Sequence, residues 1–110
     1  MLKKNDMRAY ILEGHKAVKC NDMMFWANWF EDNFKIRHVA DETVNGARIS
    51  TVFLGIDHSY GKGQPLLFET MVFGGTLDQE QTRCTTWDEA ERMHAMMVER
   101  VKQESPDNNE

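Results

Sequence analysis

Short runs of apolar residues, separated by turn residues, alternate along this chain with two segments of helical period. The runs predict two hairpins, a longer strand and a short edge strand, at residues 9–20, 35–56, 66–73 and 82–86. The helical period predicts helices over residues 21–34 and 85–103. The expected order is β-β-α-β-β-β-(β)-α, an α+β fold with a mostly antiparallel sheet of about five strands packed with two helices.

Two dipeptides favour tight turns inside the predicted hairpins. Gly14-His15 has glycine first, which suits a type II′ turn, and Asn45-Gly46 is the pair preferred in type I′ turns. A two-residue turn at Asn45-Gly46 pairs Val39 with Val52. We therefore expect each turn to set the register of its own hairpin.

The first predicted helix has an unusually wide apolar arc. Asn21 or Asp22 can cap its N-terminus. Its core-facing stripe is expected to consist of Met23, Trp26, Ala27, Phe30 and Phe34. Phe25 and Trp29 extend that stripe around one side, beyond what a single contact surface requires.

The second predicted helix has one well-defined apolar face. Thr86 and Glu89 form a capping box at its start, in which each side chain bonds a backbone N–H near the other residue. The apolar face consists of Trp87, Ala90, Met93, His94, Met97, Val98 and Val101.

Two predicted strands, the one after Asn45-Gly46 and the one over 66–73, are apolar on both faces. Strands of this kind are covered on both sides. We expect helices to cover one side of the sheet and a second copy of the protein to cover the other.

Length and composition bound the organisation of the chain. Its 110 residues leave room for one domain. We expect a flexible N-terminal extension at residues 1–8, a single α+β domain over 9–103 and a disordered tail over 104–110. An apolar content of 41% argues against general disorder.

Charge and cysteine content narrow the classes of partner. The formal net charge is −5 and the basic residues are scattered, which disfavours a nucleic-acid partner. No signal peptide and no apolar run of membrane-spanning length is evident, so we expect no membrane partner, a cytoplasmic location, and free thiols at Cys20 and Cys84. No cofactor motif is present, and none is expected.

The loop between the last two long strands carries the first candidate chemistry. Gly61-Lys62-Gly63 resembles a phosphate cradle only superficially, because a strand rather than a helix follows it. Tyr60 and Lys62 are the candidates for contacting a ligand. Asp57 and His58 have the chemistry to hold a metal or transfer protons, and the alternative is that Asp57 caps the turn while His58 is solvated.

Two polar residues interrupt apolar segments. His94 lies on the apolar face of the last helix, where it either bonds a backbone carbonyl or faces Asp57 or His58 across a small pocket. Glu69 interrupts a strand, and a buried carboxylate needs a partner. It either lines a ligand pocket or forms an ion pair. The basic residues considered for that pair are Arg37, Arg48 and Lys62.

Three large apolar residues lie off the main stripes of the predicted helices. They are Phe25, Trp29 and Met96. Aromatic residues and Met are enriched at protein interfaces, so these residues are candidates for a partner interface. The alternative is additional core beneath a loop.

Three stretches of the sequence carry a resemblance to a known group of proteins. They read "YILEGHKAVKCNDMMFWANWFE", "ISTVFLGIDHSYGKGQPLLFETMVFGG" and "TTWDEAERMHAMMVERV". Over residues 10–101 the chain resembles small uncharacterised proteins encoded by tailed bacteriophages and prophages. Such proteins tend to begin close to "YIL", which makes residues 1–8 look like an extension. The resemblance implies a phage context and brings no catalytic residues with it.

Three functions follow as hypotheses. The first is a non-enzymatic phage accessory protein that binds a host protein or a small ligand, as a homodimer or in complex with the host factor. The second is a small metal-assisted hydrolase in which Asp57 and His58 supply metal ligands, with His94 and Glu69 as their support or as the general base. The third is a minor virion component.

Overall fold

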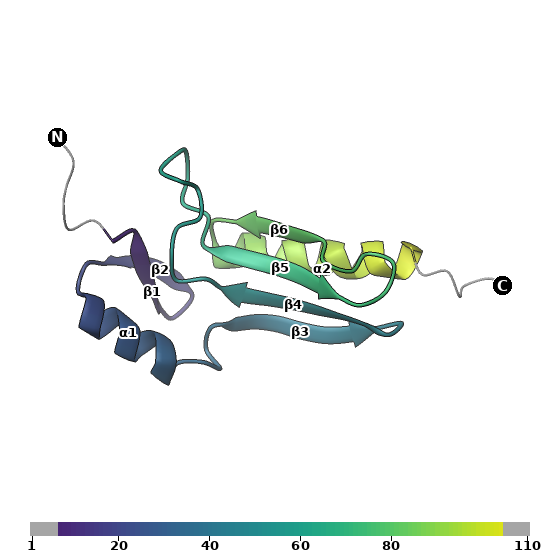
Figure 1. Ribbon diagram of the computed structural model, residues 1–110, viewed down its shortest axis with the longest axis horizontal. Coiled ribbons are helices and arrows are strands. Elements are labelled where there is room, and N and C mark those ends of the chain that lie inside the picture. The colour runs from purple at the N-terminus through teal and green to yellow at the C-terminus, as the bar shows by residue number, and fades with distance from the viewer. Residues whose placement is uncertain (1–6, 105–110) are drawn as a thin grey trace.

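The computed structural model describes residues 7–104 and confirms the α+β fold (Figure 1). Eight elements follow one another in the order that the sequence predicts. They are β1 (Ala9–Glu13), β2 (Lys16–Cys20), α1 (Met23–Asp32), β3 (His38–Val44), β4 (Ala47–Phe53), β5 (Phe68–Phe73), β6 (Gln81–Cys84) and α2 (Trp87–Glu104).

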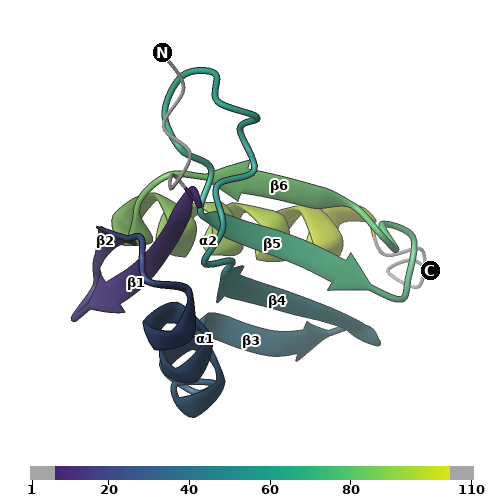
Figure 2. The same ribbon diagram turned by 60° about the vertical axis from the view of Figure 1, so that its left-hand side comes forward.

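The strands divide into two sheets rather than one. β3-β4-β5-β6 form a four-stranded antiparallel sheet, and β1-β2 form a separate hairpin. Figure 1 shows α2 passing behind the four-stranded sheet and the hairpin at one end of it. Tyr10 N donates to Gly55 O at 2.8 Å and attaches the hairpin to the loop after β4. Figure 2 shows α1 beside this hairpin, away from α2.

Both predicted turns are present. Gly14 has φ +62° with no positive φ at His15, as a type II′ turn requires, whereas Asn45 and Gly46 both have positive φ, as in type I′. The predicted pairing of Val39 with Val52 is wrong, because His38 pairs with Val52 instead. A β-bulge between His38 and Ala40 inserts Val39 as an extra residue, which the turn chemistry cannot reveal.

The core lies between the sheet and α2, in two clusters. The cluster at the hairpin end consists of Leu12, Phe53, Leu67, Phe68, Trp87 and Ala90. The cluster at the far end consists of Ala47, Ile49, Val72, Met97, Val98 and Val101. The apolar face predicted for the last helix is confirmed, since all of its residues except the half-buried Met93 are buried.

The opposite face of the sheet carries ion pairs. Arg48 Nη2 lies 2.6 Å from Asp41 Oδ2, and Arg83 Nη2 lies 3.1 Å from Glu69 Oε2. Phe73, beneath the Arg48 guanidinium, stays 44% exposed. An antiparallel face of this composition can face water. The sheet therefore needs no second layer, and cover by a second copy stays a prediction.

Helix α1 is oriented differently from the expected stripe. None of its residues is buried, and Met23, Ala27 and the following Phe34 are exposed rather than core-facing. The side of α1 that carries Trp26 faces inward, because Trp26 Nε1 donates to Tyr10 O at 3.0 Å and to Gly55 O at 3.2 Å. Because the apolar arc is wide, the sequence did not determine which side of this helix faces the core.

The ends of the chain are described only in part. Met7 N lies 3.4 Å from Asn21 Oδ1, and Arg8 O accepts a hydrogen bond from Asp57 N at 2.9 Å. These two residues of the predicted extension are therefore in contact with the domain. The predictions for residues 1–6 and 105–110 lie outside the described residues.

Two smaller expectations concern the cysteines and membrane-spanning segments. Cys20 and Cys84 both carry free thiols, and burial followed by the nearby Glu89 carboxylate raises the pKa of Cys84 to about 11. Neither helix within residues 7–104 is long and apolar enough to cross a membrane.

Candidate functional site

The Asp57 carboxylate closes the loop from inside. Its Oδ1 accepts from Ser59 N at 2.8 Å and Leu66 N at 2.9 Å, while its Oδ2 accepts from Ser59 Oγ at 2.9 Å. Arg8 Nη2 lies 3.5 Å from Oδ2. Burial alone would raise the pKa of Asp57, but these bonds and Arg8 outweigh it, and the pKa is lowered. The geometry is that of the turn cap which the sequence left as an alternative.

The other loop candidates point to no common site. His58 Nδ1 lies 2.8 Å from Ile56 O, within its own turn. Tyr60 is 80% exposed, and Lys62 is also exposed. Neither lines either of the cavities described below. Ligand binding by Tyr60 and Lys62 stays a prediction.

His94 bridges two strands rather than facing the loop. Its Nδ1 lies 2.7 Å from Thr51 Oγ1, and its Nε2 lies 2.8 Å from Glu42 Oε1. Thr51 Oγ1 in turn lies 2.5 Å from Thr70 Oγ1. His94 therefore does not pair with Asp57 or His58, nor with a backbone carbonyl.

This polar chain has the acid–imidazole–hydroxyl order of a hydrolytic triad, but its hydroxyl is inaccessible. Thr51 and Thr70 are both 0% exposed, so no substrate reaches either oxygen in this structure. This hydrogen-bonded network gives both ring nitrogens of His94 a partner in either protonation state, since each hydroxyl can donate or accept. Its evident role is to place a polar residue in the core without an unsatisfied atom.

Glu69 has a structural partner that the sequence did not suggest. Arg83, on the neighbouring strand β6, pairs with it in register and donates from Nε at 3.1 Å. The basic residues considered from the sequence were Arg37, Arg48 and Lys62, of which Arg48 instead pairs with Asp41. The ion-pair alternative is thus the one found, across two strands whose pairing was not known.

The four proposed catalytic residues consequently belong to three separate polar clusters. Asp57 and His58 share the loop, His94 lies beneath the sheet, and Glu69 lies on its opposite face. Within residues 7–104, no group of three or more His, Cys, Asp or Glu side chains is arranged to hold a metal ion. The structure gives no common centre for the hydrolase hypothesis.

A large apolar surface is exposed on and after α1. Of the eight large apolar residues that are exposed among residues 7–104, five lie within residues 23–36. We call them the α1 surface: Met23 (67% exposed), Met24 (71%), Phe25 (54%), Phe34 (60%) and Ile36 (53%). Together they expose the equivalent of about three whole side chains, or about 600 Å² at roughly 200 Å² per large side chain.

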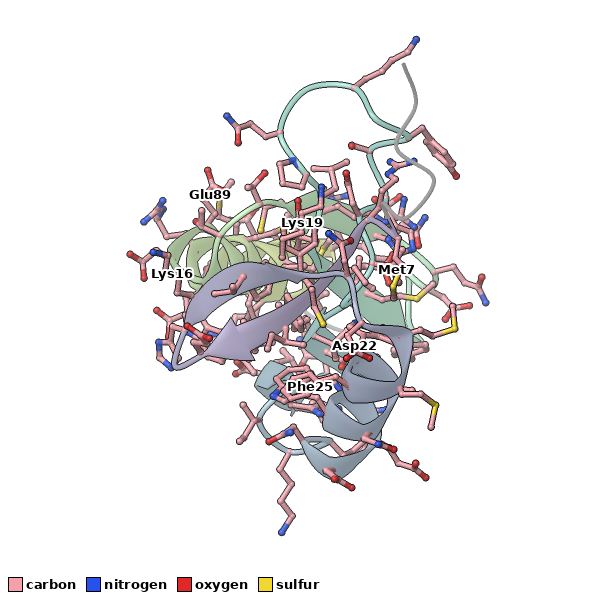
Figure 3. The ribbon with its side chains drawn as sticks, turned by 90° about the vertical axis from the view of Figure 1, so that its left-hand side faces the viewer. Met7, Lys16, Lys19, Asp22, Phe25 and Glu89 are labelled. Carbon is pink, nitrogen blue, oxygen red and sulfur yellow. The ribbon has the colours of Figure 1, made fainter. Side chains whose placement is uncertain are left out.

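The inner side of α1 explains why these residues are left outside. Trp26 and Phe30 approach Gly55 so closely that a Cβ there would lie 2.7 Å from Phe30. Trp29 packs edge-on against Phe53, with ring centroids 6.0 Å apart. Figure 3 shows Asp22 at the start of α1, where Oδ1 caps Phe25 N at 3.0 Å. These contacts use one side of α1 and leave the remaining apolar side chains to solvent.

The three predicted interface residues do not share one surface. Phe25 belongs to the α1 surface, whereas Trp29 faces inward and joins the hairpin-end core. Met96 is 69% exposed and lines a groove of about 350 Å³ between α2 and β6. The sequence did not place the other four residues of the α1 surface there, which are Met23, Met24, Phe34 and Ile36. The excess width of the apolar arc was a signal for those within the predicted helix, but not for Ile36, which follows it.

A cavity of about 550 Å³ lies between the β1-β2 hairpin, the segment before β5 and the start of α2. Its walls include Tyr10, Ala17, Leu67 and Trp87, with charged residues around them. His15, from the hairpin turn, stacks on Trp87 with ring centroids 3.8 Å apart. The sequence contains no local signal for this cavity, because its walls come from three distant segments.

No protein-family model matches this chain, and no curated protein and no solved structure matches it either. The resemblance to phage proteins therefore stays an expectation from the sequence.

Proposed function

We propose that this chain is a non-enzymatic accessory protein of a bacteriophage or prophage that acts in the bacterial cytoplasm by binding a host protein through the α1 surface. The observation that carries the proposal is that α1 has seven apolar residues out of ten and none of them buried. A helix that is apolar around most of its circumference normally lies in a core or an interface.

The shape and charge of α1 indicate the chemistry of the partner. A short exposed apolar helix suits the mode in which a helix docks into an apolar groove, anchored by large side chains such as Phe25 and Met24. Glu31 and Asp32 place two carboxylates at the negative end of the helix dipole, where cations are favoured. The expected partner therefore has an apolar groove with Lys or Arg at its rim.

A second copy of the chain fits this surface less well. In a two-fold pair of antiparallel α1 helices, Asp22 of one copy would approach Glu31 and Asp32 of the other. Like charges at that distance disfavour pairing, and a net charge of −5 adds repulsion between copies. A homodimer is therefore treated as an outcome of the test.

The test is affinity capture from bacterial host lysate with the wild-type chain and a Phe25→Ser variant, followed by purification of the captured protein. Titration calorimetry with the pure partner should show at least about 10-fold weaker binding for Phe25→Ser, the effect of removing an aromatic anchor. Binding should also weaken with added salt if a basic rim faces Glu31 and Asp32.

Met96→Ser is the matched control, because Met96 is also a large exposed apolar residue but lies on α2. It should bind the partner as the wild type does. Equal loss in both variants, or a pure partner indifferent to Phe25→Ser, would refute docking at the α1 surface. Light scattering that shows a dimer disrupted by Phe25→Ser would assign this surface to a second copy instead.

A further inference from the structure

The cavity beside Trp87 has the form of a small-molecule site. Its volume of about 550 Å³ lies within the range of ligand pockets. Leu67 is 1% exposed and Trp87 9% exposed, so its floor is firmly packed. Figure 3 looks onto this end of the molecule and shows Lys16 of the hairpin and Glu89 of α2 on the same side. Rigid walls from several elements are typical of pre-formed sites.

Trp87 already shows which chemistry its ring face accepts. The imidazole of His15 lies on it at 3.8 Å and within 6° of parallel, as a flat nitrogen heterocycle stacks on an indole. His15 is exposed and belongs to a two-residue turn, so little else holds it in place. The indole itself is held, because Nε1 donates to Glu91 Oε2 at 3.1 Å.

The charges around the cavity favour a cation. Glu13 and Asp88 line it together with a single Lys, Lys16. At the start of α2 the Glu89 carboxylate already accepts from Thr85 N and Thr86 N, both at 3.1 Å, so an anion would have to displace it from these two donors. A phosphate or carboxylate ligand would compete with that cap, whereas a cation would not.

We propose that this cavity binds a small, flat, positively charged nitrogen heterocycle, which displaces His15 and stacks on Trp87 while Glu13 and Asp88 face its charge. The site is independent of the α1 surface, since none of the five residues of that surface lines the cavity.

The test is an NMR titration of the full chain with N-methylquinolinium, read at the assigned indole N–H of Trp87. We expect a saturable upfield shift. The anionic 2-naphthoate and the non-planar tetramethylammonium should bind at least about 5-fold more weakly, because each lacks one of the two required features.

Variants on the exposed rim give opposite signs and leave the core intact. Glu13→Gln should weaken N-methylquinolinium binding and Lys16→Gln should tighten it, each by about 2- to 5-fold. His15→Ala should tighten it by about 3- to 10-fold, since the probe no longer displaces a stacked ring. Circular dichroism confirms that each variant is folded.

Three results would overturn the proposal. One is the absence of any shift at Trp87, and another is binding of 2-naphthoate as tight as that of N-methylquinolinium. The third is weaker binding by His15→Ala, which would mean that His15 does not occupy the position of the ligand.

Discussion

The two helices of this protein contradict a simple reading of hydrophobicity. α1 has seven apolar residues in ten and buries none, whereas α2 is mostly polar and buries six residues along one face. α2 lies across the four-stranded sheet, but α1 touches the rest of the molecule mainly through Trp26, Trp29 and Phe30. Burial depends on whether apolar positions recur on one face, and the total apolar content does not decide it.

This difference assigns the helices separate tasks. α2 completes the core, so its apolar face is used within the fold. Within the described residues the α1 surface stays mostly exposed, although Phe34 contacts His38 with ring centroids 4.6 Å apart, so it is the candidate for an external partner. If the helices differ in this way, substitutions on α1 should cost much less stability than substitutions on the buried face of α2.

The largest expected effect is a difference in the free energy of unfolding between two Met→Ala variants, one on each helix. Met97→Ala on α2 should lower the free energy of unfolding by about 2–4 kcal/mol, because Met97 is 3% exposed and its removal leaves a cavity. Met24→Ala on α1, at a residue 71% exposed, should change it by less than about 0.5 kcal/mol. Urea denaturation measures both. Similar losses in the two variants would break the comparison.

A second pair of variants tests how α1 is attached. Gly55→Ala places a methyl group 2.7 Å from Phe30, at φ +80°, whereas Gly46→Ala at φ +83° meets no atom within 4 Å. Both should cost about 1–2 kcal/mol in backbone strain. Only Gly55→Ala should also release α1, seen as faster amide exchange in that helix and a changed near-ultraviolet spectrum of its tryptophans.

The helix caps give a third and smaller test. Thr86→Ala removes the oxygen that accepts from Glu89 N at 3.2 Å, and it should lower global stability by about 1 kcal/mol. Asp22→Ala removes the corresponding cap of α1. It should accelerate hydrogen exchange in α1 with less than about 0.5 kcal/mol of global change. An equal global loss would make α1 part of the cooperative core.

The smallest expected effect concerns Asp57 in the loop between β4 and β5. The pKa of Asp57 is lowered in the fold, so its ionised form stabilises the protein above the unfolded-state pKa of about 4. That contribution is lost as the pH falls through the lower folded-state pKa. Asp57→Asn should therefore flatten the fall in stability on acidification, measured by urea titrations across this range. An unchanged pH profile would contradict it.

Local chemistry made much of the fold predictable. Both turn types, the capping box of α2 and the α2 face follow from residues close together in sequence, and all are found. The β-bulge at Val39 was not predictable, because it arises where β3 adjusts to its neighbour β4. The division of the strands into two sheets was also missed, because it too depends on which strands pair in the folded protein.

The candidate site was less predictable. The sequence showed that His94 and Glu69 need partners, but Glu42, Thr51 and Arg83 are 52, 43 and 14 residues away from them. Asp57 was correctly given a turn cap as one alternative, since that partner, Ser59, is two residues away. A partner close in sequence was predictable, whereas partners distant in sequence were not.

The sequence by itself determined the order of elements, the turns, the caps and the apolar face of α2, because each rests on the backbone preferences of a few neighbouring residues. Only the tertiary structure decided which side of α1 faces outward, which groups satisfy His94, and that His15 stacks on Trp87. These depend on segments far apart in the chain that meet only after folding. One proposed binding site, the cavity beside Trp87, lies where such segments meet. The other, the α1 surface, lies where they leave an apolar side of α1 uncovered.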